Sequence, residues 1–327
     1  MPDDLGAVEP LAGESAEWPV VPAAVWESRL PEVPWCPEAL VTALEPTFVT
    51  RACLEPATLT FVRAAWRVRG ASLRGKAHAH RGEFRDDALA SHADGNLLVL
   101  AVADGAGSSA LSRVGAAVTA EMAVACTVKR YHASAPSEPD SERLGTAMAH
   151  AVHDAAIRLH ALAAAADVSP AAFRTTLLLV AILGDLMLVS QVGDGAVLVQ
   201  HLDGTVARVG AMRETAWAGE VTCFVPDACA MTQAAALRRL RAGDVALIAL
   251  MTDGVDDPFH PLEQSGEALI AQWRHGTSAS IGTAQQVAAA SVLDDTDALL
   301  RWLSFEQRGE VDDRTLLLAW RADVSTG

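Results

Sequence analysis

The chain has 327 residues, of which 51% are hydrophobic, so it can bury a sizeable core and is not disordered overall. Its 25 basic and 41 acidic residues give a formal net charge of −16 at pH 7, which excludes binding to nucleic acid or an anionic membrane through a basic surface. No apolar stretch reaches the roughly 18 residues of a membrane span, and the N-terminus lacks the Lys or Arg of a signal peptide. We therefore expect a cytoplasmic protein.

The cysteine content agrees with that compartment. An odd number of cysteines, without a CxxC pair, favours reduced and mostly packed thiols over a disulfide or zinc framework. The five residues are Cys36, Cys53, Cys126, Cys223 and Cys229.

Residues 1–60 differ in composition from the rest of the chain. They hold 10 acids against 2 arginines, nine of the 15 prolines, and Trp18, Trp26 and Trp35. Proline at this density interrupts both helices and strand ladders, whereas three tryptophans are too many for a solvated tail. We predict an N-terminal arm over 1–60 that lies on a surface and covers the site, docks a kinase or braces the domain at 61–327.

Regular patterns begin near residue 60. Alternation predicts a strand at 60–69, and the continuous apolar run at 96–103 indicates a strand buried on both faces. Alanine-rich helical spacing follows at 109–131 and 141–166. Further strands are predicted at 175–183, 186–192, 195–201, 245–251 and 314–320, with a helix at 297–306. Strands in a meander with helix pairs between them favour an α+β layered sandwich over a doubly wound sheet.

Aspartates at strand ends are the first indication of chemistry. Asp104 and Asp253 each end a long apolar strand without a returning strand, and Asp312 stands just before the last strand. Carboxylates that converge repel one another unless a cation lies between them. Ligands that are all oxygen atoms favour Mg²⁺ or Mn²⁺ over zinc or copper.

Six segments in a fixed order extend this interpretation. They are HAHRGEFRDDA (78–88), VADGAGSS (102–109), FRTTLLLVAI (173–182), VGDGAVLV (192–199), GDVALIALMTDGVDD (243–257) and DDRTLLLAW (312–320). This series resembles the metal-dependent protein phosphatase (PPM) family, type 2C, in its bacterial branch with DGAGS in place of DGHGG. The resemblance covers roughly residues 63–322.

The resemblance implies a four-layer sandwich of two central antiparallel β-sheets flanked by helix pairs, with two Mn²⁺ or Mg²⁺ ions at one end. By motif, Asp104 bridges both ions and the carbonyl of Gly105 joins the second. Asp253 and Asp312 hold the first ion. The resemblance further implies that Asp86 contacts the second ion, directly or through water, and that Asp87 supports Asp86 from behind.

The resemblance also implies a reaction. A hydroxide bridging the two ions attacks phosphorus in line, and the ions neutralise the phosphoryl oxygens. We predict hydrolysis of phosphoserine and phosphothreonine in proteins, with a phosphorylated protein as substrate and a cognate Ser/Thr kinase as a further partner. The alternative is a pseudo-phosphatase that binds phosphoproteins or a kinase without turnover; the presence of all three metal aspartates favours the enzyme.

The match fails at three points. Many members carry a histidine after the DG, where this chain has Ala106, so His78 is our candidate for assisting or orienting phosphate; a merely packed or solvated histidine is the competing interpretation. Arg81 is our candidate for gripping phosphate, because a planar guanidinium suits two oxygens, although it does not align cleanly. A third ion has no clear ligand, since Ala171 lies near the expected position and Asp167 is further off.

Overall fold

The computed structural model describes residues 29–32, 34–37, 40, 57–63, 65–210, 223–276 and 291–321. Its described strands form two antiparallel sheets, one of six strands in the order β1-β2-β11-β10-β7-β8 and one of five in the order β3-β4-β5-β6-β9. The first sheet comprises β1 (Ala57–Arg63), β2 (Trp66–Leu73), β7 (Ala196–His201), β8 (Val206–Val209), β10 (Val245–Met251) and β11 (Arg314–Arg321). The second comprises β3 (Ala88–Asp94), β4 (Leu97–Ala103), β5 (Leu177–Leu183), β6 (Leu186–Val192) and β9 (Arg238–Arg241).

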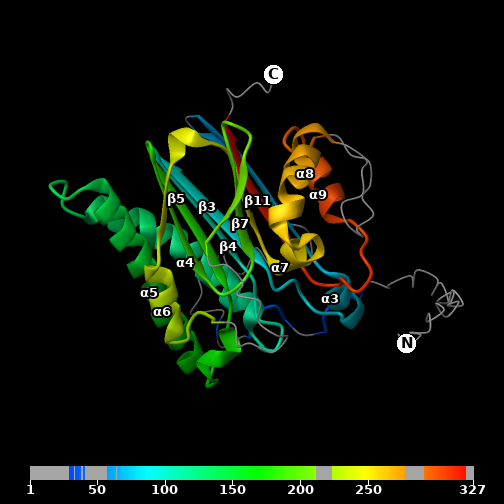
Figure 1. The fold of residues 1–327 in the computed structure, drawn as a ribbon. Coiled ribbons are helices and arrows are strands. Elements are labelled where there is room, and N and C mark those ends of the chain that lie inside the picture. The colour runs from blue at the N-terminus through cyan, green and yellow to red at the C-terminus, as the bar shows by residue number, and fades with distance from the viewer. Residues whose placement is uncertain are drawn as a thin grey trace, which may run out of the picture.

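Helices cover the outer face of each sheet (Figure 1). The five-stranded sheet carries α4 (Ser112–Ala133) and α5 (Asp140–Ala165), and the six-stranded sheet carries α8 (Leu262–His275) and α9 (Thr296–Leu303). Shorter helices are α3 (Lys76–Arg81), α6 (Cys229–Ala235) and α7 (Asp253–Asp256), with a 3-10 turn η1 (Pro170–Phe173). The predicted α+β four-layer sandwich is confirmed.

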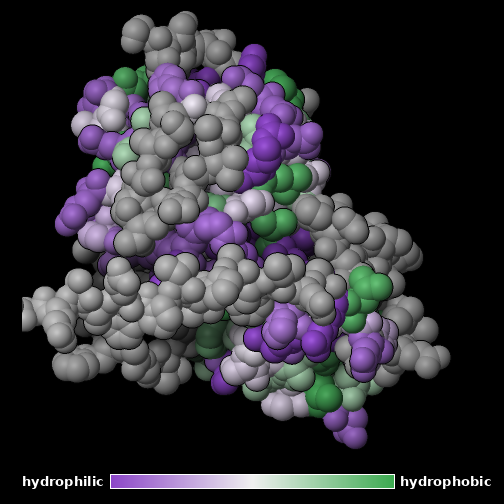
Figure 2. All heavy atoms as spheres, turned by 90° about the vertical axis from the view of Figure 1, so that its right-hand side faces the viewer, coloured by the Kyte–Doolittle hydropathy of each residue, from purple (hydrophilic) through white to green (hydrophobic). Residues whose placement is uncertain are grey.

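Strand periodicity divides the core into three layers. In β4, Leu98 and Leu100 face the opposite sheet, whereas Leu97 and Val99 face α4 and α5. Successive side chains of a strand point to opposite faces, so a strand between two apolar layers must be apolar throughout. The outer surface differs: on the α8–α9 side most described residues are hydrophilic, with hydrophobic ones in small patches (Figure 2).

The strand register explains why distant segments meet at one end of the sandwich. In the six-stranded sheet, the end of β10 pairs with the starts of β11 and β7, and the end of β2 pairs with the start of β11. In the other sheet, the end of β4 lies beside the starts of β3 and β5. The segments adjoining these ends carry the acids Asp86, Asp87, Asp104, Asp194, Asp253, Asp312 and Asp313.

Several boundaries differ from the sequence predictions. The strand predicted at 60–69 is a hairpin of β1 and β2, because the turn between them interrupts the alternation. The boundary placed at residue 60 lies inside β1. Among the described residues of the arm, Trp35, Cys36 and Leu40 are buried in the cluster beneath α4 and α5.

The cysteine prediction was wrong at one pair. Cys223 and Cys229 form a disulfide across a sequence separation of 6, while Cys36 and Cys126 are free thiols. Sequence spacing alone did not show that the chain turns back between these two positions. Cys53 lies outside the described residues. Over the described ranges, no helix is both long and apolar enough to cross a membrane.

Candidate metal centre and active site

Asp104 and Asp253 form the centre of the acidic cluster. Their carboxyl groups are within hydrogen-bonding contact of each other, one after β4 and the other after β10. Burial raises the pKa of Asp104 well above its ordinary value, and the charges of Asp253 and Asp87 raise it further. Burial raises the pKa of Asp253 to about 7, with the Asp312 charge acting in the same direction. In the ion-free protein the hydrogen bond between the two carboxyl groups requires a proton on one of them, which the raised pKa of Asp104 favours.

Close packing brings Asp253 to this position. A Cβ atom on Gly254 would lie 1.9 Å from the main-chain oxygen of Asp313, so only glycine lets the end of β10 approach the segment before β11 this closely. Gly105 is similarly enclosed, since its Cβ would lie 2.8 Å from Ser112 and 2.9 Å from the main-chain oxygen of Asp86. At Asp104-Gly105 and Asp253-Gly254, therefore, the packing leaves no room for a side chain after the aspartate.

Asp87 lies behind this pair and is satisfied by protein donors. It is buried, and its Oδ2 accepts hydrogen bonds from the hydroxyls of Thr252, at 2.9 Å, and Thr315, at 2.6 Å. These threonines lie at the end of β10 and in β11. Asp87 therefore joins the segment before β3 to both strands of the other sheet.

Asp313 makes a second buried connection. Its Oδ1 accepts from the main-chain N–H of Gly75 and its Oδ2 from that of Asp86, both at 2.5 Å. The same Oδ2 lies 2.9 Å from Nδ1 of the buried His78. Burial opposes the charged imidazole, but the hydrogen bond and the charges of Asp313 and Asp86 outweigh it and raise the pKa of His78 to about 9.

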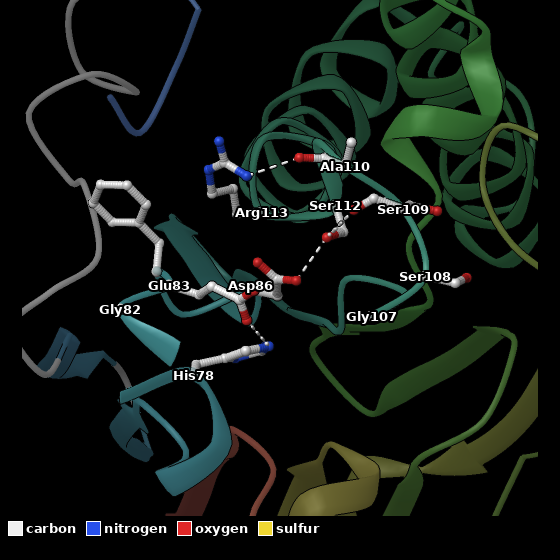
Figure 3. Close-up of a pocket in the computed structure, with 11 residues that line it drawn as sticks. His78, Gly82, Glu83, Asp86, Gly107, Ser108, Ser109, Ala110, Ser112 and Arg113 are labelled. Atoms are coloured by element: carbon white, nitrogen blue, oxygen red, sulfur yellow. Dashed lines mark hydrogen bonds and ion pairs between the residues drawn. The ribbon is translucent and has the colours of Figure 1, made fainter. Parts of the chain in front are cut away.

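A pocket of about 350 Å³ opens beside these residues. Figure 3 shows His78 and Asp86 from one side and Ser112 and Arg113 from α4 on the other. Ser112 donates from Oγ to Oδ2 of Asp86 at 2.6 Å. Burial raises the pKa of Asp86 to about 6, although this hydrogen bond lowers it. The lining is completed by Gly82, Glu83, Phe84, Gly107, Ser108, Ser109 and Ala110.

The sequence-predicted residues divide into two groups in the structure. Asp86, Asp87, Asp104, Gly105, Asp253 and Asp312 come together with His78 at one end of the sandwich. Arg81 is half-exposed, forms an ion pair with Glu83, and is absent from the pocket lining described above.

Three contributors were missed by sequence reasoning. Asp313 contacts Gly75 across 238 positions of the chain, Ser112 contacts Asp86 across 26, and Arg113 contacts Trp35 across 78. Arg113 donates from Nε to the main-chain oxygen of Trp35 at 2.7 Å and from a terminal nitrogen to that of Ala110 at 2.9 Å. The one signal in the sequence for Asp313 was that DDRT holds a second acid. The resemblance assigned a role only to the first acid, Asp312.

A protein family model for protein phosphatase 2C matches residues 74–292, which is more than half of the chain. The chain belongs to the protein phosphatase 2C family. The matched range contains β3 to β10 and the pocket lining, but not the segment with Asp312 and Asp313. Metal dependence is general to PP2C proteins. A search of curated protein sequences found no match.

Solved structures show the same fold. A bacterial serine phosphatase is 13% identical with a TM-score of 0.52, and covers 78% of this PP2C chain and 97% of its own. Serine/threonine phosphatase Stp1 from Staphylococcus aureus is 15% identical with a TM-score of 0.50, over 82% and 94% of the two chains. A C. elegans sex determining protein is 14% identical with a TM-score of 0.53, over 80% and 66%.

The donor set of this PP2C chain fits hard divalent cations. Oδ1 of Asp253 is buried and accepts no hydrogen bond. Within the described part of the chain, neither Asp104 nor Asp253 forms an ion pair with a lysine or arginine. Carboxylates that are partly removed from water without counter-charges are costly, and carboxylate oxygens are the ligands that Mg²⁺ and Mn²⁺ favour. A cation between them removes the repulsion.

Proposed function

We propose that this protein is a Mn²⁺- or Mg²⁺-dependent phosphatase that hydrolyses phosphoserine and phosphothreonine in proteins. The observation that carries the proposal is the contact between the carboxyl groups of the half-buried Asp104 and Asp253, with a buried, unsatisfied oxygen on Asp253. A phosphatase that uses two cations needs such a carboxylate pair beside a pocket open to substrate. The pocket lined by His78 and Asp86 meets that need.

Each acid has a role that follows from its surroundings. Asp104 and Asp253, to which the described residues offer no donor other than each other, would hold two cations together with Asp312 and the carbonyl of Gly105. Asp86 faces the pocket and would contribute from the second side, while Asp87 keeps the strand ends together through its threonine hydroxyls. When bound, the cations activate water for attack and neutralise charge on the phosphoryl group.

His78 is the residue of this chain suited to interact with the phosphoryl group or the leaving oxygen. Its Nδ1 is engaged by Asp313, which fixes the ring, and the ring lines the pocket. In the ion-free protein the pKa of His78 is raised to about 9, which favours the protonated imidazole, a donor from both nitrogens. His78 would thus assist or orient phosphate from the pocket wall, in a chain that has Ala106 after its DG.

Substrate recognition also follows from the pocket. Gly107 and Ser108 of the DGAGS segment, and Ser109 after it, line its wall. Arg81 stays our candidate for contacting phosphate from the rim, and a phosphoprotein made by a Ser/Thr kinase stays the expected substrate. No third ion is needed for this scheme.

The test measures hydrolysis of p-nitrophenyl phosphate and of phosphoserine and phosphothreonine peptides with Mn²⁺, with Mg²⁺ and with a chelator. We expect turnover that requires the cation and falls by more than about 100-fold in Asp253→Asn, beyond the loss typical of residues that only support a metal ligand. His78→Ala should lower kcat or raise KM for the peptides. Absence of cation-dependent turnover in the intact protein would favour a phosphoprotein-binding pseudo-phosphatase instead.

A further inference from the structure

The disulfide between Cys223 and Cys229 lies beside the candidate metal centre. Cys223 is buried, with 7% of its surface exposed, whereas Cys229 at the start of α6 is exposed. The two cysteines close a short loop, called here the 223–229 loop. One sulfur of the pair is therefore within reach of a reductant, and the other is anchored in the protein.

Main-chain hydrogen bonds attach this loop to the segment before β5. Val225 donates to the main-chain oxygen of Thr175 at 2.9 Å, and Thr175 donates to that of Val225 at 3.1 Å. Asp227 forms an ion pair with Arg174 at 3.1 Å. The carbonyl oxygen of Cys223 packs against Gly193, where a Cβ atom would lie 2.9 Å from it. The loop therefore bears on two of the segments that adjoin the site.

Thr175 passes this connection on to Asp104. It forms a β-bridge with Gly105 as well as with Val225, and its Oγ1 donates to the main-chain oxygen of Asp104 at 2.8 Å. The N–H of Thr176 donates to the same oxygen, also at 2.8 Å. Gly105, Thr175 and Val225 thus form one row of backbone. Its inner member adjoins the central aspartate, and its outer member lies in the disulfide-closed loop.

We propose that Cys223–Cys229 is a redox modification site. Its state controls how well the backbone row of Gly105, Thr175 and Val225 is ordered and, through that row, the activity of the metal centre. The regulatory half of this proposal rests on the proposed phosphatase function. A disulfide that closes a loop limits the conformations open to it, so the intact disulfide favours the paired arrangement of Val225 and Thr175. Reduction removes that constraint and loosens the outer edge of the site.

The chemistry is thiol–disulfide exchange with a dithiol, either a small molecule or a protein. One thiolate of the reductant attacks the sulfur of Cys229, the exposed residue of the pair, forming a mixed disulfide and releasing the Cys223 thiolate. The second thiolate of the reductant then attacks the reductant sulfur that is bonded to Cys229 in the mixed disulfide. This releases the Cys229 thiolate. The protein gains two electrons and, on protonation, two protons, and the reductant leaves as a disulfide.

Two readouts on the full chain test the proposal. Dithiothreitol is titrated against its oxidised form, and mass spectrometry with thiol alkylation follows the state of the pair. Amide hydrogen exchange of peptides containing Thr175 and Val225 reports the order of the row, and Mn²⁺-dependent hydrolysis of p-nitrophenyl phosphate reports the site. On reduction we expect faster exchange at both amides and a loss of activity of roughly fivefold or more, the lower end of typical coupling between two sites.

Matched variants separate this effect from a general one. Cys223→Ser and Cys229→Ser should show the reduced level of exchange and activity in every buffer, whereas Cys126→Ser, which removes a free thiol on α4, should respond like the unmodified chain. Unchanged exchange at Thr175 and Val225 after complete reduction would overturn the proposal, as would a redox response that persists in the two serine variants. A pair that stays reduced under fully oxidising conditions would also overturn it.

The two proposals fail in different ways. Faster exchange on reduction, in a chain without cation-dependent turnover in either state, would support the redox site and refute the phosphatase function. Turnover that is equal in both states, with exchange that differs, would refute the coupling of the row to the metal centre and leave the phosphatase function intact.

Discussion

Two sets of aspartates lie at the same end of the sandwich and differ in what surrounds their charge. Asp87 and Asp313 are buried among hydroxyl, main-chain N–H and imidazole donors that the fold supplies. Asp104 and Asp253 have each other, and Oδ1 of Asp253 accepts no hydrogen bond. The first set is hydrogen-bonded from within the protein, although burial and the charge of Asp313 still raise the pKa of Asp87 well above its ordinary value. The second set has a carboxylate oxygen left for a ligand from outside the protein.

The difference shows how the chain builds a cation site from many acids without losing the fold. A buried carboxylate that accepts several hydrogen bonds connects segments, so Asp87 and Asp313 stabilise the folded protein. The half-buried pair of Asp104 and Asp253, to which the described residues offer no other donor, opposes folding until a cation arrives. Asp87 and Asp313 therefore hold in place the strand ends that carry Asp104 and Asp253.

The largest expected effect is on the second set. Asp104→Asn should reduce cation-dependent hydrolysis by more than about 100-fold, because it removes the proposed ligand shared by both cations. The same change should raise the melting temperature of the ion-free protein, because it removes one charge of a repelling pair. Turnover assays with Mn²⁺ and calorimetry with a chelator measure the two effects.

The matched control for Asp104→Asn is Asp167→Asn, at a turn after α5 whose left-handed backbone asparagine also adopts. It should change neither activity nor melting temperature. An ion-free Asp104→Asn protein that melts below the unmodified chain would place Asp104 with the supporting acids and contradict the division.

Asp313→Ala should have the largest effect on stability. It leaves the N–H groups of Gly75 and Asp86 and the imidazole of His78 without their acceptor. Removing one partner of a buried pair costs about 3–5 kcal/mol of unfolding free energy. Asp313→Asn retains one acceptor oxygen and should recover part of this. Denaturant unfolding measures both, and equal stability of the alanine variant and the unmodified chain would refute the supporting role.

Thr315→Val should have a smaller effect of the same kind. The change preserves the shape of the side chain but removes the hydroxyl that donates to Asp87 at 2.6 Å and is hydrogen-bonded to the Ser72 hydroxyl at 2.6 Å. We expect a loss of about 1–3 kcal/mol of unfolding free energy, the cost of leaving buried polar groups with a partner fewer. Thr315→Ser keeps the hydroxyl and should lose less. A serine variant less stable than the valine variant would show that packing, and not the hydrogen bond, is what Thr315 contributes.

The sequence pattern predicted the positions of Asp104 and Asp253 better than the supporting role of Asp313. Asp104 and Asp253 follow long apolar strands, so local periodicity places both at strand ends, and the order of the motifs suggested that these ends meet. The role of Asp313 depends on atoms of Gly75 and Asp86, more than 220 positions away. No local pattern states that such contacts exist.

The same limit applies outside the site. The fold class followed from strands in a meander with intervening helix pairs, because periodicity is a local property. The disulfide between Cys223 and Cys229 was missed because it depends on how the loop turns. Composition predicted an arm that lies on a surface but not which surface, and Trp35 packs in the cluster beneath α4. Arg81 was chosen by its place in a motif, and its ion pair with Glu83 could not be read from that place.

The smallest expected effect concerns pH and compares the two sets in one measurement. The pKa of Asp253 in the ion-free fold is about 7, above the ordinary value of 3.8, so the folded state retains a proton that the unfolded state releases, and stability falls as pH rises from about 4 to 7. His78, raised from 6.5 to about 9 by Asp313, contributes stability below pH 6.5 that is lost as pH rises through 9. The ion-free protein should therefore melt at least about 3 °C lower at pH 8 than at pH 5. Saturating Mg²⁺ should remove the part of this pH dependence of stability that comes from Asp253, since protons and cations compete for the same oxygens. The part that comes from His78 should remain. Asp313→Asn should reduce it. An ion-free melting temperature that rises over this pH range would show that Asp253 is neutralised from within the protein after all.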